Sequence, residues 1–124
     1  MKKILIIDDS NFSRKILRKI LEKLNYQVTE ASDGMTALES FTMQQPDAVL
    51  LDLNMTGMKG LDVLSKLIEI NPNAKIVIAS ADIQESTQQM AMDIGASGYI
   101  FKPFTEDKIS EILTQLLKKE NNGH

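Results

Sequence analysis

Residues 4–9 of the chain read ILIIDD, so that four consecutive aliphatic residues run directly into two carboxylates. A continuous apolar run of this length, rather than an alternating one, predicts a β-strand that is buried on both faces. Similar short runs recur at residues 48–51 (AVLL), 76–79 (IVIA) and 99–101 (YIF), and residues 27–31 (QVTEA) are predicted to form a weaker strand. The sequence therefore predicts five short strands.

Segments with helical spacing of apolar residues separate these runs. Ser10 or Asn11 is expected to cap the first helix, and Asn25 to end it in the left-handed conformation. The apolar stripe expected on this helix consists of Phe12, Ile16, Leu17, Ile20, Leu21 and Leu24. Further helices are predicted after Asp33-Gly34, from Leu61 to Asn71-Pro72, from Ile83 to Ile94 with Ile83, Met90 and Ile94 as its apolar residues, and after a Thr105 cap. Strands that alternate with helices in this way predict an α/β fold with a doubly wound parallel sheet and helices on both faces.

The composition restricts the class of protein. A length of 124 residues, with 43% hydrophobic and 25% charged residues, is typical of a single globular domain. The absence of cysteine excludes disulfides and thiolate metal sites. A net charge of -3 argues against binding to nucleic acid or to an anionic membrane, and no transmembrane segment is predicted. We expect a cytoplasmic chain with a disordered tail over residues 120–124.

Polar residues follow four of the five predicted strands. Asp8 and Asp9 follow the first, Asp52 the third, Ser80 the fourth and Lys102 the fifth. In a doubly wound sheet these positions open onto one edge, where ligands bind. Taken singly, each residue is explained more simply as a helix cap, a turn residue or a solvated charge. As a set on one edge, they predict a site.

The charges of this set indicate which ligand would bind. Two carboxylates at ~5 Å repel each other by about 3 kcal/mol at an effective dielectric constant of about 20. A divalent cation relieves that repulsion, and hard oxygen ligands favour Mg²⁺ or Mn²⁺ over zinc. Lys102 and Ser80 would bind phosphoryl oxygens, and a carboxylate can itself act as the nucleophile. The set therefore predicts phosphoryl transfer through an acyl phosphate.

With Asp8-Asp9, Asp52, Ser80 and Lys102-Pro103 in place, the chain resembles the receiver domain of two-component response regulators from about Lys3 to Lys118. The resemblance implies a flavodoxin-like, five-stranded parallel sheet of order 2-1-3-4-5 and a receiver domain over residues 1–119. It also implies a cis peptide bond between Lys102 and Pro103.

The resemblance assigns a role to each site residue. Asp52 corresponds to the phosphoacceptor and Lys102 to the lysine that binds the phosphoryl group. Ser80 corresponds to the switch hydroxyl and Tyr99 to the switch aromatic. The Mg²⁺ ligands are expected to be Asp9 directly, Asp8 mainly through a water molecule, Asp52, and the backbone carbonyl of Asn54.

The partners are implied in the same way. The phosphoryl group would come from a sensor histidine kinase or a small acyl phosphate, and the chain would catalyse only its own phosphorylation and dephosphorylation. Because no DNA-binding or enzymatic segment follows the last predicted helix, we expect output through a protein target that contacts the fourth helix, fifth strand and fifth helix of a monomer. Asp8-Asp9-Ser10 with Arg14 looks most similar to the chemotaxis type. A phosphorelay shuttle or a phosphate sink is the alternative.

The sequence departs from the family pattern at two positions, and two other classes of protein are alternatives to a receiver domain. Thr56 and Lys59 stand where the family commonly has Pro and Asp, and without a fixed φ at position 56 we expect a looser loop. A phosphatase of the haloacid dehalogenase type would need an acid two positions after Asp52, where Asn54 stands. A flavodoxin-like electron carrier would place the flavin phosphate against an acidic edge, which would repel it.

Overall fold

The computed structural model describes residues 1–55 and 57–118. Its sheet has five parallel strands in the order β2-β1-β3-β4-β5, which confirms the predicted doubly wound topology. The strands are β1 (Lys3–Ile7), β2 (Gln27–Ala31), β3 (Ala48–Leu51), β4 (Ile76–Ser80) and β5 (Gly98–Phe101). The helices are α1 (Asn11–Lys23), α2 (Gly34–Gln44), α3 (Gly60–Ile70), α4 (Glu85–Ile94) and α5 (Glu106–Lys118).

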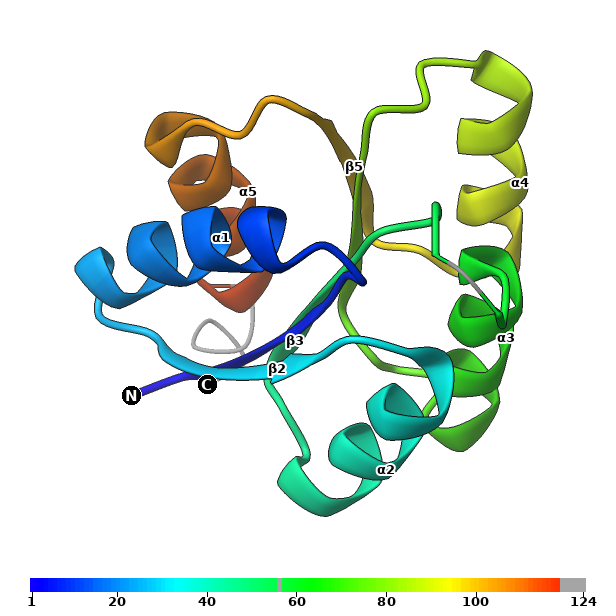
Figure 1. Ribbon diagram of the computed structural model, residues 1–124, viewed down its shortest axis with the longest axis horizontal. Coiled ribbons are helices and arrows are strands. Elements are labelled where there is room, and N and C mark those ends of the chain that lie inside the picture. Colours follow the sequence, from blue (N-terminus) through cyan, green and yellow to red (C-terminus); the bar gives the residue numbers. More distant parts are fainter. Residues whose placement is uncertain (56, 119–124) are drawn as a thin grey trace.

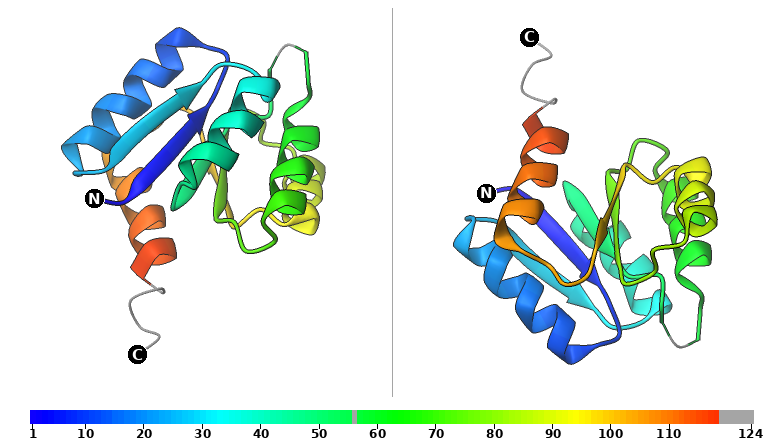
Figure 2. Two further views of the ribbon diagram at one scale, coloured as in Figure 1. Left: turned by 90° about the horizontal axis from the view of Figure 1, so that it is seen from below. Right: turned by 90° about the horizontal axis from the view of Figure 1, so that it is seen from above.

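The helices cover both faces of the sheet, as predicted. Figure 1 shows α1 and α5 on one side of the strands and α2, α3 and α4 on the other, and the two views of Figure 2 show the sheet between these layers. Successive residues of a strand point to opposite faces. Accordingly Leu5 and Ile7 belong to the core beneath α2, α3 and α4, whereas Ile4 and Ile6 belong to the core beneath α1 and α5. The continuous apolar runs thus supply both cores at once.

The predicted helix ends agree with the structure at several places. The Ser10 side chain accepts a hydrogen bond from the Ser13 backbone N–H at 3.2 Å and caps α1. Asn25 has φ 68°, the left-handed conformation expected after this helix. The Thr105 hydroxyl accepts from the Lys108 N–H at 3.3 Å, so the predicted cap of α5 is present. Gln45 also has a positive φ, 47°, which the sequence did not indicate.

Two predictions about apolar faces were wrong. Phe12 is 74% exposed, because at 100° per residue it lies about 140° around α1 from the buried Leu17. Ile83 is 73% exposed and precedes α4, which begins at Glu85. Met90, which was also expected on the apolar face of this helix, is 48% exposed, and the residue of α4 that is buried is Ala91.

Further predictions concern the Lys102–Pro103 peptide bond, the loop at Thr56, the C-terminal tail and transmembrane segments. The peptide bond between Lys102 and Pro103 is cis, as the resemblance implied. Thr56 and the tail at 120–124 lie outside the described residues, so the predictions made there remain expectations. Within residues 1–55 and 57–118, no helix combines the length and the hydropathy needed to cross a membrane.

Candidate functional site

Three carboxylates meet at the carboxyl end of the sheet. Asp8 follows β1 and Asp52 follows β3, and the two strands are neighbours joined by the Asp52 N–H, which donates to the Ile7 carbonyl at 2.9 Å. One oxygen from each of Asp8, Asp9 and Asp52 lies within 4.8 Å of the other two. Asp8 and Asp52 are 1% and 4% exposed, whereas Asp9 is open to solvent. The predicted acidic cluster is therefore present in the structure.

Local turns orient the two buried carboxylates. The Asp8 side chain accepts a hydrogen bond from the Ser10 N–H at 2.9 Å. In the same i, i+2 pattern, the Asp52 side chain accepts from the Asn54 N–H at 3.0 Å. Each carboxylate thus has one oxygen held by the backbone and one facing the cluster. The Asn54 side chain itself is exposed.

Lys102 brings a positive charge into this cluster from the end of β5. Its Nζ donates to Asp52 Oδ2 at 3.2 Å, to Asp8 Oδ2 at 3.4 Å and to Ser13 Oγ at 3.3 Å. Burial opposes the charge on this amine, but the neighbouring Asp52 and Asp8 carboxylates outweigh it and raise the pKa of Lys102. The lysine is accordingly charged and is held next to the predicted phosphoacceptor. Its Nζ also lies 5.7 Å from the centre of the Phe104 ring.

The donor set fits a hard divalent cation. Burial, together with the charge of Asp52, raises the pKa of Asp8 despite its contacts with Ser10 and Lys102. Lys102 contacts two of the three carboxylates, those of Asp8 and Asp52. Two ligands on one Mg²⁺ lie at most about 4.2 Å apart, so a separation of up to 4.8 Å needs only a small side-chain movement or a bridging water. Oxygen donors without nitrogen or sulfur suit Mg²⁺ or Mn²⁺.

Ser80 and Tyr99 lie on the β4–β5 side of the cluster. Ser80 is fully buried, and its hydroxyl accepts from the Asp82 N–H at 3.1 Å. The Tyr99 hydroxyl donates to the Asp82 carbonyl at 2.8 Å. Burial raises the pKa of Tyr99 above its usual value. The two predicted switch residues are therefore connected through one loop residue, and the carbonyl of Ser80 accepts from the Lys102 N–H at 2.9 Å.

Sequence reasoning did not predict several contacts that support the site. Arg14 Nη1 donates to the backbone carbonyl of Asp8 at 2.6 Å. Its Nε donates to Glu30 Oε1 at 3.0 Å, and Arg18 binds the other oxygen of the same carboxylate. Ser13 contacts Lys102 directly. Glu30 lies beside α1 because β2 pairs with β1. The spacing of these residues along the chain could therefore not predict the network.

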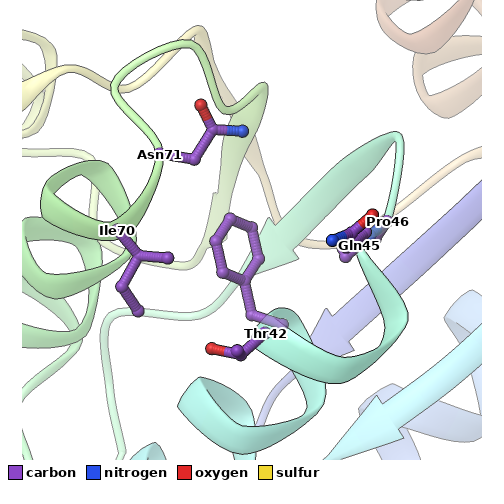
Figure 3. Close-up of a pocket in the computed structure, with 6 residues that line it drawn as sticks. Thr42, Gln45, Pro46, Ile70 and Asn71 are labelled. Carbon is purple, nitrogen blue, oxygen red and sulfur yellow. The ribbon is translucent and has the colours of Figure 1, made fainter.

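A cavity of about 430 Å³ lies elsewhere, between the carboxyl ends of α2 and α3. Figure 3 shows Thr42, Gln45 and Pro46 across it from Ile70 and Asn71. These residues precede β3 and β4, whereas Asp52 and Ser80 follow them. The cavity is therefore at the opposite edge of the sheet from the acidic cluster, and it shares no lining residue with it.

The chain is similar to known proteins over most of its length. The sequence model of the response regulator receiver domain matches residues 4–114. The chemotaxis protein CheY of Thermotoga maritima is 37% identical over 118 residues, covering 94% of this chain and 98% of that protein. Sporulation initiation phosphotransferase F of Bacillus subtilis is 33% identical over 121 residues and covers 98% of both chains. CheY in the CheX–CheY–BeF₃–Mg complex of Borrelia burgdorferi has a TM-score of 0.89 at 29% identity, covering 93% of this chain and 88% of that one.

Proposed function

The chain belongs to the response regulator receiver domain family of two-component signalling, and from this premise we propose that Asp52 accepts a phosphoryl group. The observation that carries the proposal is the buried Asp52 carboxylate beside the Lys102 ammonium, 3.2 Å away, at the acidic edge of the sheet. An oxygen of Asp52 attacks phosphorus, and the bond from phosphorus to the donor's leaving group breaks. The product is an acyl phosphate on Asp52.

The other site residues position the incoming group. Asp8, Asp9, Asp52 and the backbone carbonyl of Asn54 would hold Mg²⁺, which supplies positive charge to the phosphoryl oxygens when it is bound. Lys102 offers a second positive charge from the β5 side. Because its Nζ already lies between Asp52 and Asp8, it needs little movement to reach a phosphoryl oxygen on Asp52. The phosphodonor proposed is a sensor histidine kinase or a small acyl phosphate.

Phosphorylation is proposed to reach the surface through Ser80 and Tyr99. A phosphoryl oxygen offers the Ser80 hydroxyl a charge-assisted hydrogen bond, which competes with its present bond from the Asp82 N–H. Movement of the Ser80 hydroxyl changes the surroundings of Tyr99, whose own hydroxyl bonds to Asp82. The face formed by α4, β5 and α5 would respond to this movement. This face is the proposed surface for a downstream protein.

The chemotaxis type is the role favoured for this receiver domain, because several relatives at 34–37% identity are chemotaxis CheY proteins. A phosphorelay shuttle is the second candidate, favoured by the likeness to sporulation initiation phosphotransferase F. The phosphorylated chain, mixed with a purified histidine phosphotransfer domain, distinguishes the two. Rapid loss of the phosphoryl group to a histidine supports the shuttle, and retention supports the chemotaxis type.

The proposed chemistry is tested by incubation with acetyl phosphate and Mg²⁺, followed by intact-mass measurement. We expect a gain of one phosphoryl group that hydroxylamine removes, and little gain when the metal is chelated. Asp52→Asn should gain none. Asp62→Asn is the matched control, since Asp62 is an exposed carboxylate on α3 that takes no part in the site. Full labelling of Asp52→Asn would refute the assignment.

A further inference from the structure

Arg14 joins the start of α1 to the main chain of the acidic cluster. Its Nη1 donates to the backbone carbonyl of Asp8 at 2.6 Å, a short bond of the kind that a charged donor forms. Because β1 ends at Ile7, this carbonyl lies beyond the strand, in the peptide unit that links Asp8 to Asp9. The guanidinium group therefore holds the peptide unit between two of the proposed metal ligands.

The Arg14 side chain is itself held in place. It is only 13% exposed, and its three guanidinium nitrogens have three different partners. Nε donates to Glu30 Oε1 on β2 at 3.0 Å, and Nη2 donates to the Asn11 side chain. The planar fork of an arginine fixes the directions of these bonds relative to one another. Arg14 is thus a rigid link from β2 to the Asp8 carbonyl rather than a mobile surface charge.

Other contacts fix the remaining polar groups of Asp8. Its N–H donates to the Ala31 carbonyl at 3.1 Å, and its side chain accepts from the Ser10 N–H at 2.9 Å. Rotation of the peptide unit that follows Asp8 would break the bond to Arg14 and change the direction in which the Asp9 side chain projects. The contact with Arg14 therefore sets the position of Asp9 relative to Asp8.

A fixed arrangement of ligands matters most for a small cation. Mg²⁺ requires nearly ideal octahedral geometry with ligands at about 2.0–2.1 Å, whereas Ca²⁺ accepts more oxygens at longer and more variable distances. Groups that orient metal ligands from outside typically change the metal affinity about 10-fold to 100-fold when they are mutated. Resting on the proposed metal site, we propose that Arg14 is a positioning residue that fixes Asp8 and Asp9 and thereby makes the site prefer Mg²⁺ to Ca²⁺.

Geometry and charge lead to opposite expectations for the loss of Arg14. A guanidinium charge next to the cluster repels any divalent cation, although the Glu30 carboxylate, which also binds Arg18, offsets part of that charge. If charge alone mattered, removal of Arg14 would tighten the binding of Mg²⁺ and Ca²⁺ alike. If Arg14 positions the ligands, its removal weakens the binding of Mg²⁺ and affects that of Ca²⁺ less. The ratio of the two dissociation constants therefore separates the two effects.

The test measures metal binding to the unphosphorylated protein. The electron paramagnetic resonance signal of free Mn²⁺ reports how much Mn²⁺ is bound, and competition with Mg²⁺ or Ca²⁺ gives the dissociation constants of these ions. In Arg14→Met, we expect the dissociation constant for Mg²⁺ to rise about 10-fold and that for Ca²⁺ by less than about threefold. Arg14→Lys should show the same loss, because an ammonium keeps the charge but lacks the fork that reaches Asp8 and Glu30 together.

Arg18→Met is the matched control for loosening of α1. Arg18 binds the same Glu30 carboxylate as Arg14, and its Nη2 donates to the Val28 carbonyl at 3.4 Å. The variant therefore loses a positive charge and contacts between α1 and β2, but it keeps the bond from Arg14 to the Asp8 carbonyl. The ratio of the Mg²⁺ and Ca²⁺ dissociation constants should be the same as in wild type.

The outcomes separate the inference from the metal site on which it rests. An unchanged ratio or tighter Mg²⁺ binding in Arg14→Met would overturn the positioning role while wild type still binds the metal. An equal change of the ratio in Arg18→Met would also overturn it, because loosening of α1 would then explain the loss. Wild type that binds none of the three cations would overturn the proposed metal site and this inference with it. Circular dichroism shows whether Arg14→Met is folded, and if it is not, Arg14→Lys decides by the same criteria.

Discussion

Asp8→Asn should stabilise the metal-free protein. Asp8 lies within 4.8 Å of the Asp52 carboxylate and 3.4 Å from Lys102 Nζ. At an effective dielectric constant of about 20, these distances correspond to about 3.5 kcal/mol of repulsion and about 5 kcal/mol of attraction. The exposed Asp9 adds a smaller, solvent-screened repulsion. The Coulomb energies therefore nearly cancel.

Because the Coulomb energies nearly cancel, burial decides whether Asp8→Asn raises or lowers the free energy of unfolding. Asp8 is 1% exposed, and burial is the main reason why its pKa is raised, so the charged form is disfavoured in the folded chain. Removing that charge should raise the free energy of unfolding by about 1–2 kcal/mol, since a buried ion costs several kcal/mol before its partners offset it. The amide oxygen of Asn can still accept the Ser10 N–H.

Urea denaturation with and without Mg²⁺ measures this effect. At a Mg²⁺ concentration 100 times its Kd, the free energy of unfolding of wild type should rise by about 2.7 kcal/mol. That of Asp8→Asn should rise much less, so the difference in stability between the two proteins should shrink or change sign. Glu69→Gln, which removes one exposed negative charge from α3, is the control and should change neither value appreciably. A metal-free Asp8→Asn variant less stable than wild type would refute the reasoning, because the pair with Lys102 would then outweigh burial and repulsion.

Further predictions concern pH, packing and signalling. Burial opposes ionisation of Glu30, but the two arginines of α1 outweigh it and lower its pKa below 4.5. Glu30→Gln should therefore lower the free energy of unfolding by about 1–3 kcal/mol at neutral pH. The difference should vanish as the pH falls through the lowered pKa, which denaturation measured over a range of acidic pH values would show. Gly60→Ala places a Cβ 2.3 Å from the Leu53 Cα, so circular dichroism should show a melting temperature lower by several degrees. Tyr99→Trp fluorescence should change with beryllofluoride and Mg²⁺, and Ser80→Ala should reduce that change; an indifferent spectrum would exclude the proposed switch.

The fold followed from the sequence because β1, β3 and β4 are built on uninterrupted apolar runs. Such runs predicted β1, β3 and β4 within a residue or two, and Ser10 and Thr105 marked helix starts. Parallel strands followed from the alternation of strands and helices. The order of the strands did not, since alternation alone permits several orders, and it came from the resemblance to receiver domains.

The site was predicted in part. Asp8, Asp52 and Lys102 converge because parallel strands end at the same edge of the sheet. The positions of Phe12 and Arg14 depend on rotation around α1 and on which strand packs beside it. Helical spacing defines a stripe, but it does not say whether the first turn still faces the sheet, and for this reason Phe12 was assigned to the core.

The proposed reaction converts the Asp52 carboxylate to an acyl phosphate. Borohydride reduces such an acyl phosphate to an alcohol and so converts the phosphorylated aspartate to homoserine, which peptide mass mapping can locate. After treatment with acetyl phosphate and Mg²⁺, we expect homoserine at position 52 and unmodified Asp8 and Asp9. Homoserine at position 8 or 9, or at no position in a protein that has gained phosphoryl mass, would contradict it.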